Sequence, residues 1–247
     1  MIWVNGKEIA QEHFSAGELK IKLFPSSREV VDVVWHYEND AELFTISSIR
    51  EYYMSKPCRL YIPYLPHARM DRVKNVEDVF TLKAFARYIN ALNFSTVYVW
   101  DAHSNVGPAL LNNCENKGIR EELNYAITDI QCTSGDDNVV LFFPDEGSMK
   151  RYSDMINMPY AFGIKKRDWE TGKILGLDIM NAELVKGKNV LITDDICSRG
   201  GTFFHAAKAL KAAGANGKWS PVVDIPSRFN GASMGRSYSD DVDMIVK

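Results

Sequence analysis

The sequence has 247 residues, of which 46% are hydrophobic and 25% are charged, and its formal net charge is −3. This composition indicates a globular protein with one large or two modest domains, and the charge excludes a broad attraction to nucleic acid or anionic lipid. The apolar stretches are far shorter than the roughly 20 residues of a membrane-spanning helix, and the first residues lack a signal-peptide pattern. We therefore expect a cytoplasmic protein that binds neither nucleic acid nor a membrane.

Strand-like and helix-like segments alternate along the first half of the chain. It opens with a hairpin-like segment at residues 1–24, in which Asn5 and Gly6 are the candidate turn. Strands are expected at residues 30–37, 59–63 and 96–100, and helices at residues 41–54 and 80–92. This order is typical of a parallel sheet covered by helices.

The alternation restarts in the second half. Strands are expected at residues 125–130, 139–143, 160–164, 190–193 and 222–225, and helices near residues 148–156 and 203–213. The loop-like composition of residues 133–138 marks a boundary between the halves. We therefore predict an α/β protein with two Rossmann-like domains, at residues 1–135 and 136–247, each with a parallel sheet covered by helices.

A glycine-rich turn follows the expected strand at residues 190–193. It begins with the acidic pair Asp194 and Asp195, and its later residues are Ser198, Arg199, Gly200, Gly201 and Thr202. In a parallel sheet such a turn lies at the carboxyl edge, where the following helix presents N–H groups to an anion. The glycines let the backbone approach a phosphate, and the carboxylates suit sugar hydroxyls or hydrated Mg²⁺. The turn indicates a sugar-phosphate site, with an ordinary capped helix as the alternative.

Charged residues also follow the other expected strands. Behind residues 59–63 they are His67, Arg69, Asp71 and Arg72, which suit a polyphosphate, although a solvated loop is the alternative. Behind residues 96–100 they are Asp101 and His103, which can orient a magnesium-bound triphosphate, although most single histidines are structural.

Two further segments in the second half carry candidate residues. Asp145 follows an expected strand and precedes a helix, where a carboxylate complements the helix dipole. Lys165 and Arg167 belong to a basic excursion that is either functional or a solvated hairpin. The four cysteines are widely spaced without a CxxC pair, which argues against a zinc site or a disulfide framework. We expect buried or unreactive thiols, with a reactive Cys197 inside the phosphate turn as the alternative.

These motifs resemble, in order, those of known enzymes. The turn at residues 192–202 resembles the signature shared by type I phosphoribosyltransferases and ribose-phosphate pyrophosphokinases, in which the acidic pair meets the ribose and the loop holds its 5-phosphate. Residues 61–72, and Asp101 with His103, resemble motifs of the pyrophosphokinases alone. The resemblance runs colinearly from about Phe14 to Pro226 and implies a shortened, phage-type pyrophosphokinase homologue with the phosphoribosyltransferase-type fold.

The resemblance implies an ATP-dependent reaction. The anomeric hydroxyl of a ribose 5-phosphate group attacks the β-phosphorus of Mg-ATP, so that AMP leaves and a 1-diphosphate forms. The implied catalytic residues are Lys165, Arg167 and His103. The implied ATP contacts are Phe14, Glu18, Arg69, Asp71, Arg72 and His103. The implied ribose-phosphate contacts are Asp194, Asp195, Ser198, Arg199, Gly200, Gly201 and Thr202, and the implied Mg²⁺ ligands are Asp101, His103 and Asp145.

Some positions depart from the family pattern. Ala16 and Met70 replace an aspartate and a glutamine at adenine contacts, and Ile164 replaces the aspartate that precedes the family's catalytic lysine. The loop with Phe14 and Glu18 reaches a neighbouring subunit in the family, so we expect a homo-oligomer.

Three alternatives remain open at the level of sequence. Ser198 and Arg199 stand where the family has Asp-Thr, which removes a negative charge, adds a positive one, and favours a more anionic acceptor such as ADP-ribose in an NAD-rebuilding reaction, an activity said to occur in phages. The second alternative is a type I phosphoribosyltransferase. The third is a regulatory homologue that has lost catalysis.

Overall fold

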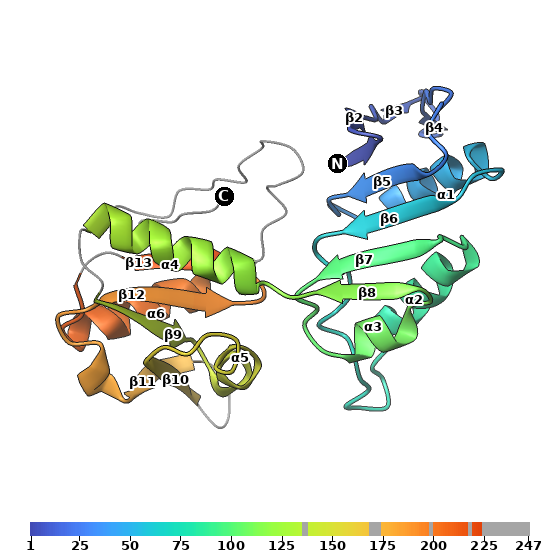
Figure 1. The fold of residues 1–247 in the computed structure, drawn as a ribbon. Coiled ribbons are helices and arrows are strands. Elements are labelled where there is room, and N and C mark those ends of the chain that lie inside the picture. The colour runs from blue at the N-terminus through green and yellow to red at the C-terminus, as the bar shows by residue number, and fades with distance from the viewer. Residues whose placement is uncertain (135–137, 168–173, 198–199, 217–218, 224–247) are drawn as a thin grey trace. The chain divides into compact units, whose positions relative to one another are not determined.

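A computed structural model describes the chain except for residues 135–137, 168–173, 198–199, 217–218 and 224–247. At residues 133–134, 166–167, 174–175 and 219–223 it describes the backbone alone. The chain forms two compact units, of which the first is Met1–Gly118 and the second begins at Ile119 (Figure 1).

The first unit contains a six-stranded sheet. In spatial order its strands are β2 (Lys7–Glu8), β1 (Ile2–Val4), β5 (Val31–Trp35), β6 (Cys58–Ile62), β7 (Thr96–Trp100) and β8 (Cys114–Lys117). Strands β5 to β8 are parallel, and β1 and β2 add an antiparallel hairpin to one edge. A separate hairpin consists of β3 (Glu12–His13) and β4 (Leu19–Lys20).

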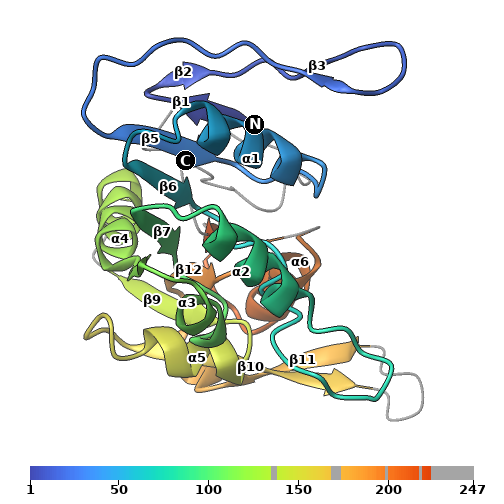
Figure 2. The same ribbon diagram turned by 90° about the vertical axis from the view of Figure 1, so that its right-hand side faces the viewer.

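Three helices cover one face of this sheet: α1 (Glu42–Tyr52), α2 (Thr81–Ala91) and α3 (Val106–Leu110) (Figure 2). The spacing of buried residues in α2 explains this packing, because Leu82, Phe85 and Ile89 recur every three or four residues and form one apolar stripe. The stripe packs into the same core as Leu60 and Ile62, which alternate along β6 toward the helices.

The turn expected at Asn5 and Gly6 is confirmed. Both residues adopt the left-handed conformation, with φ of 51° and 83°, which suits asparagine and glycine in a two-residue hairpin. Asn5 also joins the hairpin to β5, because the backbone N–H of Asp32 donates a hydrogen bond of 3.0 Å to Asn5 Oδ1.

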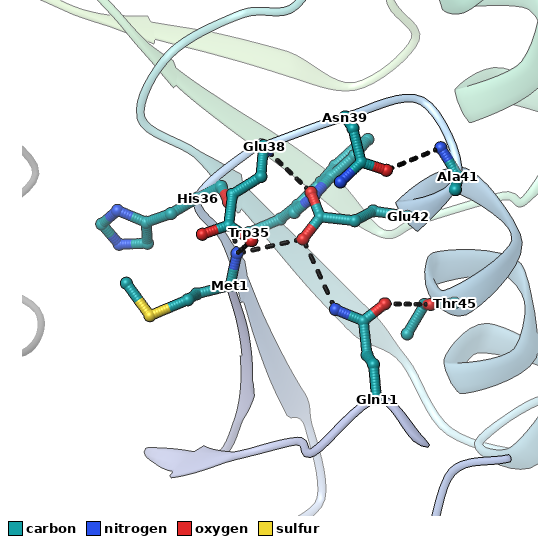
Figure 3. A network of polar contacts seen from close by, with 9 residues as sticks. All are labelled: Met1, Gln11, Trp35, His36, Glu38, Asn39, Ala41, Glu42 and Thr45. Atoms are coloured by element: carbon teal, nitrogen blue, oxygen red, sulfur yellow. Dashed lines mark hydrogen bonds and ion pairs between the residues drawn. The ribbon is translucent and has the colours of Figure 1, made fainter. Parts of the chain in front are cut away.

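A buried carboxylate joins the hairpin, β5 and α1 (Figure 3). Glu42 is only 2% exposed, and its Oε2 accepts hydrogen bonds from Trp35 Nε1 at 2.9 Å and from the backbone N–H of Glu38 at 2.8 Å. The Met1 α-amino group lies 3.0 Å from Oε1. Burial acts to raise the pKa of Glu42, but these donors outweigh it and hold the pKa below its usual value.

The second unit contains a five-stranded sheet with helices on both faces. In spatial order its strands are β11 (Ile174–Met180), β10 (Tyr160–Arg167), β9 (Val139–Phe143), β12 (Asn189–Asp194) and β13 (Trp219–Val223). All are parallel except β11, which is antiparallel to β10. The helices α4 (Arg120–Ser134) and α5 (Glu146–Tyr152) pack on one face and α6 (Gly201–Ala212) on the other, and the 3₁₀ turn η1 (Ala182–Leu184) precedes β12.

The prediction of a strand at residues 125–130 is wrong, because these residues belong to α4. The apolar residues Ile127 and Ile130 read as a strand, but together with Leu123 they are spaced for one buried face of a helix. Since α4 packs against β9 and β12, the two units divide between Gly118 and Ile119, whereas the boundary expected after residue 135 lies at the end of this helix.

The α/β class with mainly parallel sheets covered by helices is confirmed in both units. The sequence patterns missed α3, β8 and β11; β8 is a polar edge strand, and β11 is the antiparallel partner of β10. The other expected elements are observed, and the strand expected at residues 222–225 is seen as Trp219–Val223 within the described part of the chain. None of the described helices is long and apolar enough to cross a membrane.

Candidate active site

Two acidic strand ends come together in the second unit. Asp145 follows β9 and Asp194 ends β12, and because these strands are parallel neighbours, both residues lie at the carboxyl edge of the sheet. Asp145 is the N-cap of α5, and its Oδ1 accepts a hydrogen bond of 3.0 Å from the backbone N–H of Ser148. The Ser148 hydroxyl donates to Asp194 Oδ1 at 2.7 Å and lies 3.2 Å from Asp145 Oδ1.

The two carboxyl groups differ in their affinity for a proton. Burial, together with the charges of Asp195 and Asp145, raises the pKa of Asp194 to about 6, against the effect of the hydrogen bond from Ser148. Burial also acts to raise the pKa of Asp145, but the hydrogen bonds from Lys165 and Ser148 outweigh it and lower that pKa. The site therefore pairs an ionised carboxylate with a group that titrates near neutral pH.

Cationic side chains pair with Asp145 and with Asp195, the residue that follows Asp194. Lys165, on β10, places its Nζ 2.7 Å from Asp145 Oδ2, so the residue expected to act on the transferred group is paired with a residue expected to bind metal. Arg151, on α5, places Nη1 3.0 Å from Asp195 Oδ2. The side chain of Arg167 lies outside the described atoms.

The phosphate turn is described in part. Gly200 adopts the left-handed conformation, with φ of 71°, and caps α6, so the helix begins at Gly201 and its first N–H groups face the turn. A β-carbon at Gly201 would meet no atom of the described residues within 4 Å. Ser198 and Arg199 lie outside the described residues. Burial raises the pKa of the Cys197 thiol, which opposes the role of a reactive thiolate.

The candidate ATP residues of the first unit lie on the loops after β6 and β7. Asp71 is buried, and the guanidinium of Arg72 donates to its two carboxylate oxygens at 2.7 and 3.2 Å. These bonds lower the pKa of Asp71 against the effect of its burial, with smaller contributions from a hydrogen bond with Ser104 and the charge of His103. Asp71 and Arg72 are thus paired, and His103 lies close enough for its charge to act on Asp71.

The other candidate residues of these two loops are an expected ATP contact, an expected metal ligand and a histidine of the polyphosphate segment. His67 has a left-handed backbone, with φ of 61°, and its Nε2 lies 2.9 Å from Asp40 Oδ1. Arg69 is exposed. Asp101 is 8% exposed at the end of β7 and also has a left-handed backbone, with φ of 41°.

The loop expected to reach a neighbouring subunit is a tight, exposed hairpin between β3 and β4. The backbone N–H of Phe14 donates to the Glu18 carbonyl at 2.9 Å, and Gly17 adopts a φ of 89°. The side chain of Phe14 is 55% exposed and Glu18 is exposed, so both residues are available for a contact.

Magnesium would have to bind with help from substrate. Among the residues that the structure describes, no group of three or more His, Cys, Asp and Glu side chains could hold a metal ion. Mg²⁺ commonly takes one or two protein carboxylates and completes its shell with water and substrate phosphates. Asp101 and Asp145 supply the right donor type, so the residues present fit an ion that binds together with a phosphorylated substrate.

Sequence reasoning missed two residues of this site, Ser148 and Arg151. Both lie on α5 at intervals of three from Asp145, so they share a face of the helix with the capping residue. That spacing is the signal that could have found them.

Comparison with solved structures identifies the class of fold. The phosphoribosylpyrophosphate synthetase from Mycobacterium smegmatis matches 87% of this chain and 71% of its own with a TM-score of 0.68, at 19% sequence identity. The chain therefore has the phosphoribosyltransferase-type α/β fold of such synthetases. No protein-family model matches the sequence.

The sequence is also similar to those of curated proteins. A protein of Thermococcus kodakarensis is 28% identical over 233 residues, which are 85% of this chain and 80% of its own. A protein of Pyrococcus abyssi is 28% identical over 212 residues, which are 82% of this chain and 70% of its own. A protein of Saccharolobus solfataricus is 26% identical over 198 residues, which are 74% of this chain and 62% of its own. All three are named ribose-phosphate pyrophosphokinase. The chain is therefore similar over most of its length to proteins of this name, in agreement with the resemblance of its ordered motifs.

Proposed function

We propose that the chain transfers the diphosphate of Mg-ATP to the anomeric hydroxyl of a ribose 5-phosphate group and releases AMP. The proposal rests on the cluster in the second unit, at the strand ends beside the glycine turn. There the Ser148 hydroxyl lies within hydrogen-bond distance of both Asp145 and Asp194. Carboxylates of this kind bind sugar hydroxyls, and a turn at a helix N-terminus binds the 5-phosphate. The names of the curated relatives support the same reaction.

Each group has a part in such a transfer. Arg69, Arg72 and His103 would bind the triphosphate, because cations neutralise the charge that concentrates on the transferred oxygens. Asp194 and Asp195 would orient the ribose for in-line attack. Lys165, with Arg167, would stabilise the moving diphosphate once its ammonium group leaves Asp145.

Magnesium would have Asp145 as a candidate ligand in the second unit and, separately, Asp101 with His103 as candidate ligands in the first, in each case together with substrate oxygens. When bound, it would neutralise polyphosphate charge. We therefore expect AMP formation to stop on addition of a chelator and to return with excess Mg²⁺. Full activity after chelation would contradict the metal assignments.

One observation favours ADP-ribose as a second candidate acceptor. Phe204, on the first turn of α6, is 52% exposed, and its ring meets that of His205 edge-on at 5.7 Å. Side chains of a helix lean toward its N-terminus, which for Phe204 is the direction of Gly200 and Gly201. An exposed ring beside a phosphate turn offers a stacking surface for an adenine attached through the 5-phosphate.

A single assay separates these functions. The purified chain is incubated with Mg-ATP and either ribose 5-phosphate or ADP-ribose, and AMP is measured. AMP with one acceptor supports the pyrophosphokinase, and the ratio of the two kcat/KM values identifies the acceptor. Absence of AMP with both would leave a phosphoribosyltransferase, which joins a base to the ribose of a 5-phosphoribosyl 1-diphosphate and releases its diphosphate, or a non-catalytic homologue.

A further inference from the structure

Ser148 lies where the ends of β9 and β12 meet, and the proposed reaction assigns it no contact with substrate. We infer that Ser148 is a positioning residue of the acceptor site, which fixes the carboxylate of Asp194 relative to that of Asp145. This inference rests on the proposed function, because it concerns the affinity of the same site for its sugar phosphate.

Ser148 donates hydrogen bonds to both carboxylates, and it uses a different group for each. Its backbone N–H bonds to Asp145 Oδ1 at 3.0 Å, which is the normal capping bond of the helix. Its hydroxyl has a single proton, and the distance of 2.7 Å to Asp194 Oδ1, against 3.2 Å to Asp145 Oδ1, directs that proton to Asp194. The residue is 5% exposed, so water does not readily replace it.

The next turn of the same helix extends this role. Arg151 lies three residues after Ser148 and pairs with Asp195 at 3.0 Å. One face of α5 therefore contacts all three acidic residues that are expected at the ribose, the first as its cap and the other two through side chains.

Loss of the hydroxyl has a specific consequence. Asp194 would keep the hydrogen bond of 3.1 Å from the backbone N–H of Asp195, which comes from its own loop. It would lose the bond that fixes it to α5 and hence to Asp145. The carboxylates would then be free to move apart, because like charges repel in a poorly hydrated site. Acceptor binding would weaken, whereas residues that bind ATP in the first unit would be unchanged.

The experiment compares Ser148→Ala with Ser148→Thr, which restores a hydroxyl, and with Thr193→Val as a matched control. Thr193 is fully buried on β12, and its hydroxyl has no hydrogen-bond partner among the described residues. We expect Ser148→Ala to raise the acceptor KM about tenfold with the KM for ATP within twofold, and Ser148→Thr to recover most of the loss. Thr193→Val should leave both constants unchanged.

A double-mutant cycle on acceptor affinity, measured by titration calorimetry, gives a readout that general destabilisation would not produce. Ser148→Ala and Asp194→Asn should couple by at least threefold, whereas Ser148→Ala and Asp195→Asn should be additive. Ser148→Cys, close in size but a weak donor, replaces the alanine variant if that protein does not fold. An acceptor KM within twofold of wild type, or additivity with Asp194→Asn, would overturn the inference. AMP formation by the wild-type chain tests the proposed function separately.

Discussion

Lys165 and Asp145 form an ion pair of 2.7 Å, although each has a proposed role of its own. A lysine that acts on the transferred diphosphate must leave this carboxylate, and Asp145 can then accept a cation in its place. The pair therefore holds both residues in the substrate-free site. At the scale of single residues, a substitution in one member of the pair can test its own role.

We predict that Lys165→Ala lowers kcat about 100-fold, on the order of 3 kcal/mol, because a cation aimed at the transferred group acts mainly in the transition state. The dissociation constant for ATP should change less than threefold. Steady-state kinetics and ATP titration measure the two effects. Lys150→Ala is the matched control, since Lys150 is an exposed cation of the same unit that pairs with Glu146 at 3.3 Å. An unchanged kcat in Lys165→Ala would remove this residue from the mechanism.

The raised pKa of Asp194 predicts a pH-dependent stability. Its pKa is about 6 in the folded chain, above the ordinary value of 3.8, so its contribution to stability is fully present below about pH 4 and is lost as the pH rises through 6. Asp194→Asn removes this cost. We therefore compare the free energy of unfolding of the variant with that of wild type at each pH. This difference should be about 1–2 kcal/mol more favourable to the variant at pH 8 than at pH 4. The variant should also lose affinity for the acceptor.

Thermal unfolding across pH 4–8 measures this difference. Glu146→Gln is the matched control, because Glu146 is an exposed carboxylate on the first turn of α5 and should give no comparable trend. A melting-temperature difference between Asp194→Asn and wild type that stays constant from pH 4 to pH 8 would contradict the raised pKa.

At the scale of elements, the approach of α3 to the loop after β6 depends on Gly107. A β-carbon at this position would overlap Cδ2 of Leu65, which is 2% exposed and lies six residues before the buried Asp71. We predict that Gly107→Ala destabilises the protein by about 1–3 kcal/mol and raises the KM for ATP severalfold, because the buried side chain of Leu65, or the loop that carries it, must shift to relieve the overlap.

Chemical denaturation and ATP kinetics measure these effects. Gly118→Ala provides the control, since a β-carbon there would meet no atom within 4 Å. A Gly107→Ala protein with wild-type stability and wild-type KM would show that the loop tolerates the displacement.

At the scale of the whole molecule, the exposed β3–β4 hairpin predicts self-association. Phe14 is 55% exposed at its tip, where an aromatic side chain can complete a site on another copy of the chain. We expect sedimentation velocity to detect an oligomer, and Phe14→Ala to raise the KM for ATP about tenfold with little change in stability. Phe44→Ala is the control, because Phe44 on α1 is 63% exposed without such a role. A strictly monomeric wild-type protein with full activity would contradict the expectation.

Local patterns in the sequence determined much of the fold and the position of the candidate residues along it. The Asn5-Gly6 turn, the strand that ends at Asp194 and the glycine cap of α6 all follow from the conformational preferences of a few consecutive residues. Colinear motifs then indicated the enzyme family. These features are local, so no knowledge of the other strands was needed to recognise them.

The tertiary structure alone decided which strand ends meet and where their side chains point. Residues 125–130 have an apolar pattern that suits either a strand or a buried helix, and packing on β9 and β12 selects the helix. The contact of Ser148 with Asp194, 46 residues away, exists because β9 and β12 are neighbours in the sheet. Strand order results from long-range pairing and core packing, and these depend on the whole unit rather than on any short stretch of sequence.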